Sequence, residues 1–200
     1  MVTEHFEFAG WTDNLRLAND QVEVVILREA GPRIISLRPL NGFNVFKVVA
    51  VIPQPPLGTH PNDFLPNRSL TLWPFTDLSD DRIRFGQLFI RFRQADRGPI
   101  KFGLRHTEKW AGYVLGDHLF LKTIPLIKGK QYPDLGSNFE LFTNEEFLEL
   151  ESLGPYEEIS PGQTAKHTEI WVVFSGIRLP HLYDEEGFAE AIDPYLKQLL

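Results

Sequence analysis

The sequence predicts an all-β protein, an antiparallel β-sandwich with a short C-terminal helical segment. Short segments rich in Val, Ile, Leu, Phe and Trp recur along the chain, and such residues suit a pleated, half-buried surface better than a helix. Fifteen prolines and fifteen glycines separate these segments. Many short strands at this spacing are typical of a sandwich or barrel, so we predict a single β-sandwich domain over residues 1–200.

Each predicted strand is bounded by residues that favour turns. Asn41-Gly42, Asp134-Leu135-Gly136 and Ser160-Pro161-Gly162 are the clearest turn signals. The predicted strands span 22–27, 33–37, 69–73, 85–93, 100–104, 119–124, 139–142, 147–151 and 167–174.

Two segments depart from the strand pattern. Residues 52–67 contain five prolines and predict a connecting loop of polyproline character. Residues 184–200 have apolar residues at helical spacing, and Asp193-Pro194 predicts the start of a second short helix inside this segment. We expect the helical segment to cover an open edge or end of a sheet.

Composition excludes several classes of function. Lys and Arg number 20 against 27 acidic residues, and a net charge of −7 makes nucleic acid a poor partner. The absence of cysteine excludes disulfides, thiolate catalysis and Cys-type zinc sites. No apolar run is long enough to span a membrane, and the first twenty residues do not resemble a secretory signal. We therefore expect a cytoplasmic protein that interacts with no membrane.

The common motifs of nucleotide, zinc-protease and α/β-hydrolase sites are missing. Six histidines are scattered without the spacing of metal ligands, so we expect no metal and no cofactor. Carboxylates and aromatic residues on strands remain, and this combination suits carbohydrate. Aromatic rings stack on the C–H faces of a sugar, while carboxylates and arginines bind its hydroxyl groups.

The segment 147–151, Phe-Leu-Glu-Leu-Glu, carries the main candidates for catalysis. On a strand, Glu149 and Glu151 lie on one face, because side chains alternate. If that face is enclosed, the two carboxylates repel and one pKa rises, which suits a general base. The alternative is a solvent-facing strand with two ordinary acids.

Charge is unevenly distributed along the chain. Two strand regions of opposite sign are expected to pair across a sheet, and the alternative is a groove of mixed charge that suits polar sugars. The basic region contains Arg82, Arg84, Arg91, Arg93, Arg97, Lys101 and Arg105, and the acidic region contains Glu140, Glu145, Glu146, Glu149, Glu151, Glu157 and Glu158.

A series of short motifs, in a shared order, resembles an uncharacterised branch of the galactose-mutarotase-like (aldose 1-epimerase-type) superfamily. The likeness covers residues 11–46 and 63–174. The motifs are Gly31-Pro32-Arg33-Ile34, Phe64-Leu65-Pro66-Asn67-Arg68, Leu72-Trp73-Pro74-Phe75-Thr76-Asp77-Leu78 with Asp81-Arg82, Tyr132-Pro133-Asp134-Leu135-Gly136-Ser137-Asn138-Phe139-Glu140, the segment 147–155, Ile159-Ser160-Pro161-Gly162 and His167-Thr168-Glu169-Ile170-Trp171.

This resemblance implies a large antiparallel supersandwich whose concave sheet holds a sugar. It also implies aldose 1-epimerisation, in which a glutamate takes the proton of the anomeric hydroxyl and a histidine protonates the ring oxygen. Glu149 matches the base first, Glu151 second and Glu140 third.

The chain also departs from the family pattern, because only residues 47–64 join two motifs that are widely separated in relatives. The histidine that donates the ring proton is therefore expected to be missing. No motif matches His60 to it, and His106 and His167 would replace it only through a favourable geometry.

Five further residues are candidate substrate ligands, each with a structural alternative. Trp73 and Trp110 are stacking platforms or core anchors. Arg33 either binds a ligand or forms an ion pair with an acidic residue of another strand. Arg82 either binds substrate or belongs to a turn that Asp77 and Asp81 cap. Lys122 faces the sugar or the opposite side, depending on strand register.

The sequence thus predicts a protein that recognises a monosaccharide or sugar derivative, with aldose 1-epimerase activity through a glutamate base. The alternative is a non-catalytic carbohydrate-binding or interaction module without the acid catalyst. A third alternative is a homo-oligomer in which a second chain covers exposed sheet edges.

Overall fold

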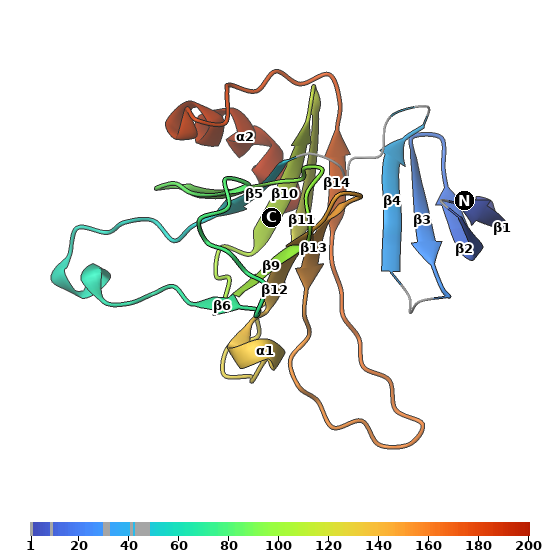
Figure 1. Ribbon diagram of the computed structural model, residues 1–200, viewed down its shortest axis with the longest axis horizontal. Coiled ribbons are helices and arrows are strands. Elements are labelled where there is room, and N and C mark those ends of the chain that lie inside the picture. Colours follow the sequence, from blue (N-terminus) through green and yellow to red (C-terminus); the bar gives the residue numbers. More distant parts are fainter. Residues whose placement is uncertain (1, 9, 30–32, 41, 43–48) are drawn as a thin grey trace. The chain divides into compact units, whose positions relative to one another are not determined.

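The computed structural model describes residues 2–8, 10–29, 33–40, 42 and 49–200. The chain forms two compact units, Met1–Lys47 and Val48–Leu200, where the sequence predicts one domain over 1–200. Strands dominate both units, and every strand pair is antiparallel, so the predicted all-β class is confirmed (Figure 1).

The first unit is a four-stranded antiparallel meander. Its strands are β1 (Val2–Phe8), β2 (Trp11–Ala18), β3 (Val22–Leu27) and β4 (Arg33–Pro39), in that spatial order. Side chains of β3 alternate between buried and half-buried, as expected for a sheet with one covered face. That covered face holds Val25 and Leu27 together with Glu23.

Glu23 is buried in the first unit and is paired with two arginines. Its carboxylate lies 2.5 Å from Arg16 Nε and 2.5 Å from an Arg38 guanidinium nitrogen. Arg38 lies directly opposite Glu23 across β3 and β4. This pairing satisfies a charge that would otherwise be costly to bury.

The second unit contains a six-stranded sheet in the order β14-β11-β10-β5-β8-β7. These strands are β5 (Val49–Pro53), β7 (Ile83–Phe85), β8 (Phe89–Arg93), β10 (Trp110–Leu115), β11 (His118–Thr123) and β14 (Trp171–Phe174).

A four-stranded sheet, in the order β13-β12-β9-β6, packs on one face of the larger sheet. Its strands are β6 (Leu70–Leu72), β9 (Ile100–Leu104), β12 (Phe139–Thr143) and β13 (Leu148–Ser152). Phe92 of β8 and Phe102 of β9 meet edge to face, 5.1 Å between ring centroids, and Tyr113 of β10 donates to the Leu148 carbonyl of β13. The two sheets therefore share a core, which makes the second unit sandwich-like.

Helix α2 (Glu185–Leu199) covers the other face of the six-stranded sheet (Figure 1). Phe188 and Ile192 of the helix pack with Val51 and Leu121 of the sheet. The helix is continuous through Pro194, so the prediction of a second helix starting at 193–194 is wrong. Packing of the apolar face keeps the helix intact across the proline. Among the described residues, no helix combines the length and apolarity needed to span a membrane.

Most predicted strands are confirmed, within a few residues at their ends. Residues 85–93 form parts of two strands rather than one, because the chain turns at Gly86 between β7 and β8. The proline-rich segment 52–67 is a loop after Pro53, with a 3-10 turn, η1 (Pro61–Phe64). Four observed strands were not predicted, namely β1, β2, β5 and β10. Asn41 of the predicted turn lies outside the described residues, as do Gly31 and Pro32 of the first motif.

Candidate functional site

The candidate site lies on the outer face of the four-stranded sheet, away from the other sheet. One row of residues crosses all four strands there, because strand register places Thr71, Gly103, Glu140 and Glu151 opposite one another. The predicted catalytic Glu151 and the predicted ligand Glu140 are therefore direct cross-strand neighbours. Like charges in that position destabilise a sheet unless something compensates them.

Lys101 of β9 supplies the compensation. Its ammonium lies 2.7 Å from Glu140 Oε2 and 3.2 Å from Glu151 Oε2, and it sits 5.0 Å from the centroid of the Trp73 ring. Burial by itself lowers the pKa of Lys101, but the two carboxylates outweigh it, so the pKa is raised and the ammonium stays charged. Cross-strand pairing of the basic and acidic regions is thus confirmed for Lys101, whereas several of the arginines pair elsewhere.

A tight turn, α1 (Pro133–Gly136), lies over the middle of this row. Three of its residues, Asp134, Leu135 and Gly136, have positive φ angles of 48°, 59° and 98°. The Asp134 carbonyl accepts hydrogen bonds from Ser137 and from Thr71 of β6, which hold the turn on the sheet.

Gly103 makes this approach feasible. A Cβ on residue 103 would lie 2.5 Å from Ser137 Oγ, so a larger residue there would displace the turn. The strained turn and the glycine together bring Asp134 to the site, and neither the glycine nor Asp134 is singled out as functional by the sequence. Strain of this kind is concentrated at functional positions in proteins.

Glu140 is the most enclosed carboxyl group of the face. Its side chain is 2% exposed. Burial raises the pKa of Glu140, Lys101 opposes that rise, and the neighbouring Asp134 carboxyl adds to it, so the net pKa is raised. Oε1 of Glu140 is buried and receives no hydrogen bond from the described residues. This oxygen is therefore a buried acceptor without a hydrogen-bond donor among the described residues.

Glu149 and Trp73 lie on or beside the same face. Glu149 is opposite Phe142 across β12 and β13, two residues along the strands from the Glu140–Glu151 pair, and it is half-buried. Trp73 follows β6 and is also half-buried. The structure thus brings together Glu140, Glu149, Glu151 and Trp73 of the predicted site residues, with Lys101 at their centre.

Trp110 is not part of this face, and its prediction as a stacking platform is corrected. Its side chain is 6% exposed in the cluster between the six-stranded sheet and α2. The Phe89 ring packs edge-on against it, with centroids 6.3 Å apart. An enclosed ring offers no surface to a sugar, so Trp110 is a core anchor.

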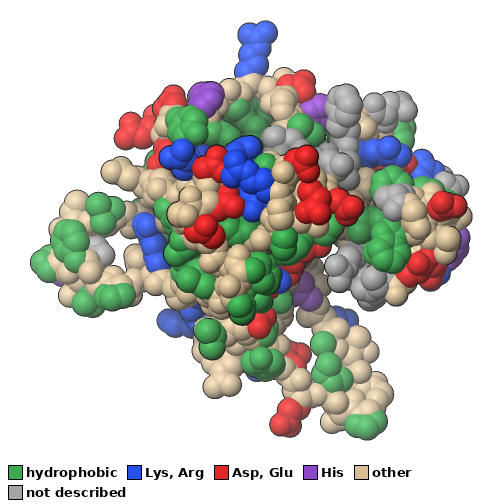
Figure 2. Space-filling model, in the orientation of Figure 1, with side chains coloured by type: hydrophobic (Ala, Val, Ile, Leu, Met, Phe, Trp, Pro, Cys, Tyr) green, Lys and Arg blue, Asp and Glu red, His purple; other side chains and the backbone are tan. Residues whose placement is uncertain are grey.

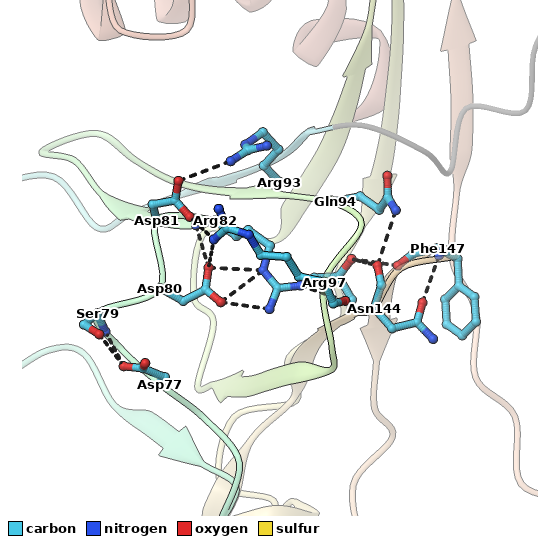
Figure 3. A network of polar contacts seen from close by, with 11 residues as sticks. Asp77, Ser79, Asp80, Asp81, Arg82, Arg93, Gln94, Arg97, Asn144 and Phe147 are labelled. Carbon is cyan, nitrogen blue, oxygen red and sulfur yellow. Dashed lines mark hydrogen bonds and ion pairs between the residues drawn. The ribbon is translucent and has the colours of Figure 1, made fainter.

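Arg82 belongs to an ion-pair network rather than to the candidate site (Figure 3). Its side chain is 4% exposed, and its guanidinium donates to both carboxylate oxygens of Asp80. Arg97 contacts Asp80 and Asp81, and Arg93 pairs with Asp81 at 3.5 Å. The hydrogen bond from Arg82 is the main cause of the lowered pKa of Asp80. The network ties the turn before β7 to the end of β8.

Lys122 lies on the face between the two sheets, opposite to the candidate site. Its ammonium is 3% exposed, contacts Glu169 Oε1 at 3.0 Å and donates to the Leu150 carbonyl. Burial is the main cause of its lowered pKa, and Glu169 opposes that effect. Strand register therefore directs Lys122 toward the interior, and its prediction as a ligand on the sugar-binding face is corrected.

His106 and His167, the two histidines that would replace the missing proton donor, have structural roles. His106 is 3% exposed, its Nε2 is 2.8 Å from the Trp110 carbonyl, and burial lowers its pKa to about 4. His167 Nε2 contacts both Ser152 Oγ at 2.8 Å and Glu169 Oε1 at 3.3 Å. A Ser–His–acid relay uses the two ring nitrogens separately, so this cluster does not have that geometry.

Arg33 begins β4 in the first unit, and its side chain lies outside the described residues, so its predicted role stays a prediction. In the part of the chain that the structure describes, no group of three His, Asp or Glu side chains is arranged to hold a metal ion. Comparisons with protein-family models, with curated proteins and with solved structures find no match. The observed class is thus an all-β, sandwich-like protein with an acid–lysine–aromatic face.

Proposed function

We propose that the outer face of β6, β9, β12 and β13 binds a carbohydrate or a sugar derivative. The single observation that carries this proposal is the convergence of Glu140, Glu151 and Lys101 beside the Trp73 ring. Hydroxyl-rich ligands need this mixture, because carboxylates accept from hydroxyl groups, an ammonium donates to them, and an aromatic ring packs on C–H faces.

The charges of the face also favour a neutral polar ligand. Lys101 is already neutralised by two carboxylates, so an anionic ligand would have to compete with both of them. A hydroxyl group adds to this network as a donor to Glu151 or as an acceptor from Lys101 without displacing either. The resemblance to galactose-mutarotase-like proteins supports the same ligand class.

Aldose 1-epimerase activity is the second candidate. Its support is the pair of unlike carboxyl groups on adjacent strands, Glu140 with a raised pKa and Glu151 beside it. A carboxyl group whose pKa is raised is suited to donate a proton, and a second carboxyl group beside it is suited to accept one. A non-catalytic binding module needs the same face but no proton transfer.

Saturation-transfer NMR with a panel of common aldoses tests binding. We expect Glu151→Gln and Trp73→Ala to weaken the affinity of a bound sugar about tenfold or more, which is about 1.4 kcal/mol. Glu145→Gln is the matched control, because Glu145 is exposed in the turn between β12 and β13, the strands that carry Glu140 and Glu151. The proposal fails if no aldose binds at millimolar concentration, or if Glu145→Gln weakens binding as much as Glu151→Gln.

Exchange NMR between the α and β anomers of a bound sugar separates the enzyme from the module. An epimerase accelerates exchange, and separate Glu149→Gln and Glu151→Gln variants show which carboxylate is the base. Loss of a general base costs about 10²–10⁴-fold in rate. Binding without acceleration identifies a module.

A further inference from the structure

Strand β6 is an edge strand of three residues at one end of the four-stranded sheet. It pairs with β9 on one side, and among the described residues no strand lies on its other side. Leu70 and Leu72 of this strand are 37% and 48% exposed, although the register places them on the face toward the other sheet. The sandwich is therefore open at this edge.

The other edges of the two sheets are protected in ways that β6 is not. Strand β7 carries the exposed Arg84, and β13 carries Glu149 and Glu151. Strand β14 is half-buried along its length, and its Phe174 packs on Tyr195 of α2, with centroids 4.7 Å apart. Charged or covered edges resist pairing with another chain, whereas a bare apolar edge favours it.

The chain around β6 concentrates exposed apolar surface. Of the seventeen exposed large hydrophobic side chains in the described part of the chain, eight lie between residues 57 and 85. The loop 54–69 projects away from the sheets and presents green apolar side chains at its tip in Figure 2. The eight residues are Leu57, Phe64, Leu65, Leu70, Leu72, Phe75, Leu78 and Phe85.

The part of this surface in residues 54–76 carries almost no charge, whereas the stretch 77–85, which holds Leu78 and Phe85, contains three Asp and two Arg residues. Residues 54–76 contain one Asp and one Arg, while the whole chain has a net charge of −7. The guanidinium of that Arg68 already donates to Gln54 Oε1 at 2.7 Å and to the Pro55 carbonyl. Two acidic molecules can approach each other through this neutral region without strong repulsion.

From these four observations we infer that β6 and the loop 54–69 form the interface between two copies of this chain. The two β6 strands pair antiparallel about a two-fold axis near Thr71, which joins two four-stranded sheets into one of eight strands. An antiparallel edge is complementary to itself, so a second copy needs no additional segment to complete the pairing. The projecting loop of each copy covers the open, leucine-lined edge of the other.

This arrangement also extends the candidate site. Thr71 lies in the same cross-strand row as Gly103, Glu140 and Glu151, so pairing at β6 places the rows of the two copies end to end. The inference does not depend on sugar binding, because it rests on the edge, the apolar surface and the charge.

Sedimentation velocity on the whole chain, over a wide range of concentration, tests the inference. We expect the parent protein to sediment as a dimer that dissociates on dilution. Leu72→Lys places a charge on the open edge and is expected to raise the dissociation constant at least ~tenfold, or about 1.4 kcal/mol. Ile127→Lys is the matched control, because Ile127 has the same 48% exposure and lies in the loop between β11 and α1, outside β6 and the loop 54–69.

A second variant guards against misfolding of the first. Leu57 is 80% exposed in the projecting loop, outside both sheets, so Leu57→Lys leaves the fold intact and is also expected to weaken the dimer. Hydrogen exchange should show β6 amides protected in the dimer and less protected on dilution. A parent protein that stays monomeric at every concentration overturns the inference. In that case either another part of the same chain or a different protein covers the edge. Unchanged association of both lysine variants also overturns it.

Discussion

The carboxylate of Glu185 occupies the space beside Gly86, where a Cβ would lie 1.6 Å from its Oε1. Its other oxygen accepts hydrogen bonds from the backbone N–H groups of Gln87 and Leu88, at 2.8 and 2.9 Å. The first turn of α2 is therefore attached to the turn between β7 and β8, two segments about a hundred residues apart in sequence.

We predict that Gly86→Ala destabilises the second unit by about 1–3 kcal/mol, because Glu185 must leave and two backbone donors lose their partner. Thermal or denaturant unfolding measures the change. Gly98→Ala is the control, since nothing lies within 4 Å of a Cβ at that glycine. Equal effects of the two substitutions would contradict the role given to Glu185.

Lys101→Met removes the ammonium group that pairs with both Glu140 and Glu151. We expect a loss of about 3–5 kcal/mol in the free energy of unfolding, because a buried carboxylate is left without its partner. The double variant Lys101→Met/Glu140→Gln should recover much of that loss. Lys197→Met is the comparison, because its pair with Asp193 is exposed and is worth at most ~0.5 kcal/mol.

His106 should titrate far below an ordinary histidine. Burial lowers its pKa from 6.5 to about 4, so the unfolded chain takes up the proton first as pH falls. The stability contributed by neutral His106 is complete above pH 6.5 and is lost between pH 6.5 and about 4, by about 3 kcal/mol. NMR titration gives the midpoint, and a midpoint near 6.5 would exclude this account.

Glu23 makes the first unit sensitive to acid. Burial raises its pKa, but the hydrogen bonds and charges of Arg16 and Arg38 together have a larger, opposite effect. The net pKa is therefore below 4.5. Its contribution to stability is therefore present above pH 4.5 and disappears as pH falls through the lowered pKa. Hydrogen exchange of β3 amides measures this.

The comparison for that experiment is Glu23→Gln against Glu7→Gln, an exposed residue of β1. At neutral pH we expect Glu23→Gln to speed exchange and Glu7→Gln to leave it unchanged. The difference should shrink in acid. A difference that persists well below pH 4.5 would show that packing, rather than charge, accounts for the effect of Glu23.

Strands with dense apolar and β-branched residues were predictable, as 22–27 and 100–104 show. Strands β1 and β2 were not, because acidic and polar residues interrupt their apolar pattern. Strand β10 was missed although its first four residues are buried, since a segment enclosed on both faces lacks the alternation that marks a half-buried strand.

The site shows the same division. Period-two spacing placed Glu149 and Glu151 on one face, and the observed register agrees. The partner of Glu151 could not be derived in this way, because Lys101 is fifty residues distant and reaches it only when β9 pairs with β12. Trp73 and Trp110 were equivalent as sequence, yet one borders the site and the other lies in the core.

Local composition by itself determined that this chain forms antiparallel strands joined by proline and glycine turns, with a helix at the end, because those preferences act over a few residues. Tertiary structure alone decided that the chain forms two units, that Lys122 faces the interior and Lys101 the outer face, and that Asp134 reaches Glu140. These outcomes depend on which strands become neighbours and in what register. Long-range packing sets that choice, and one sequence does not reveal it.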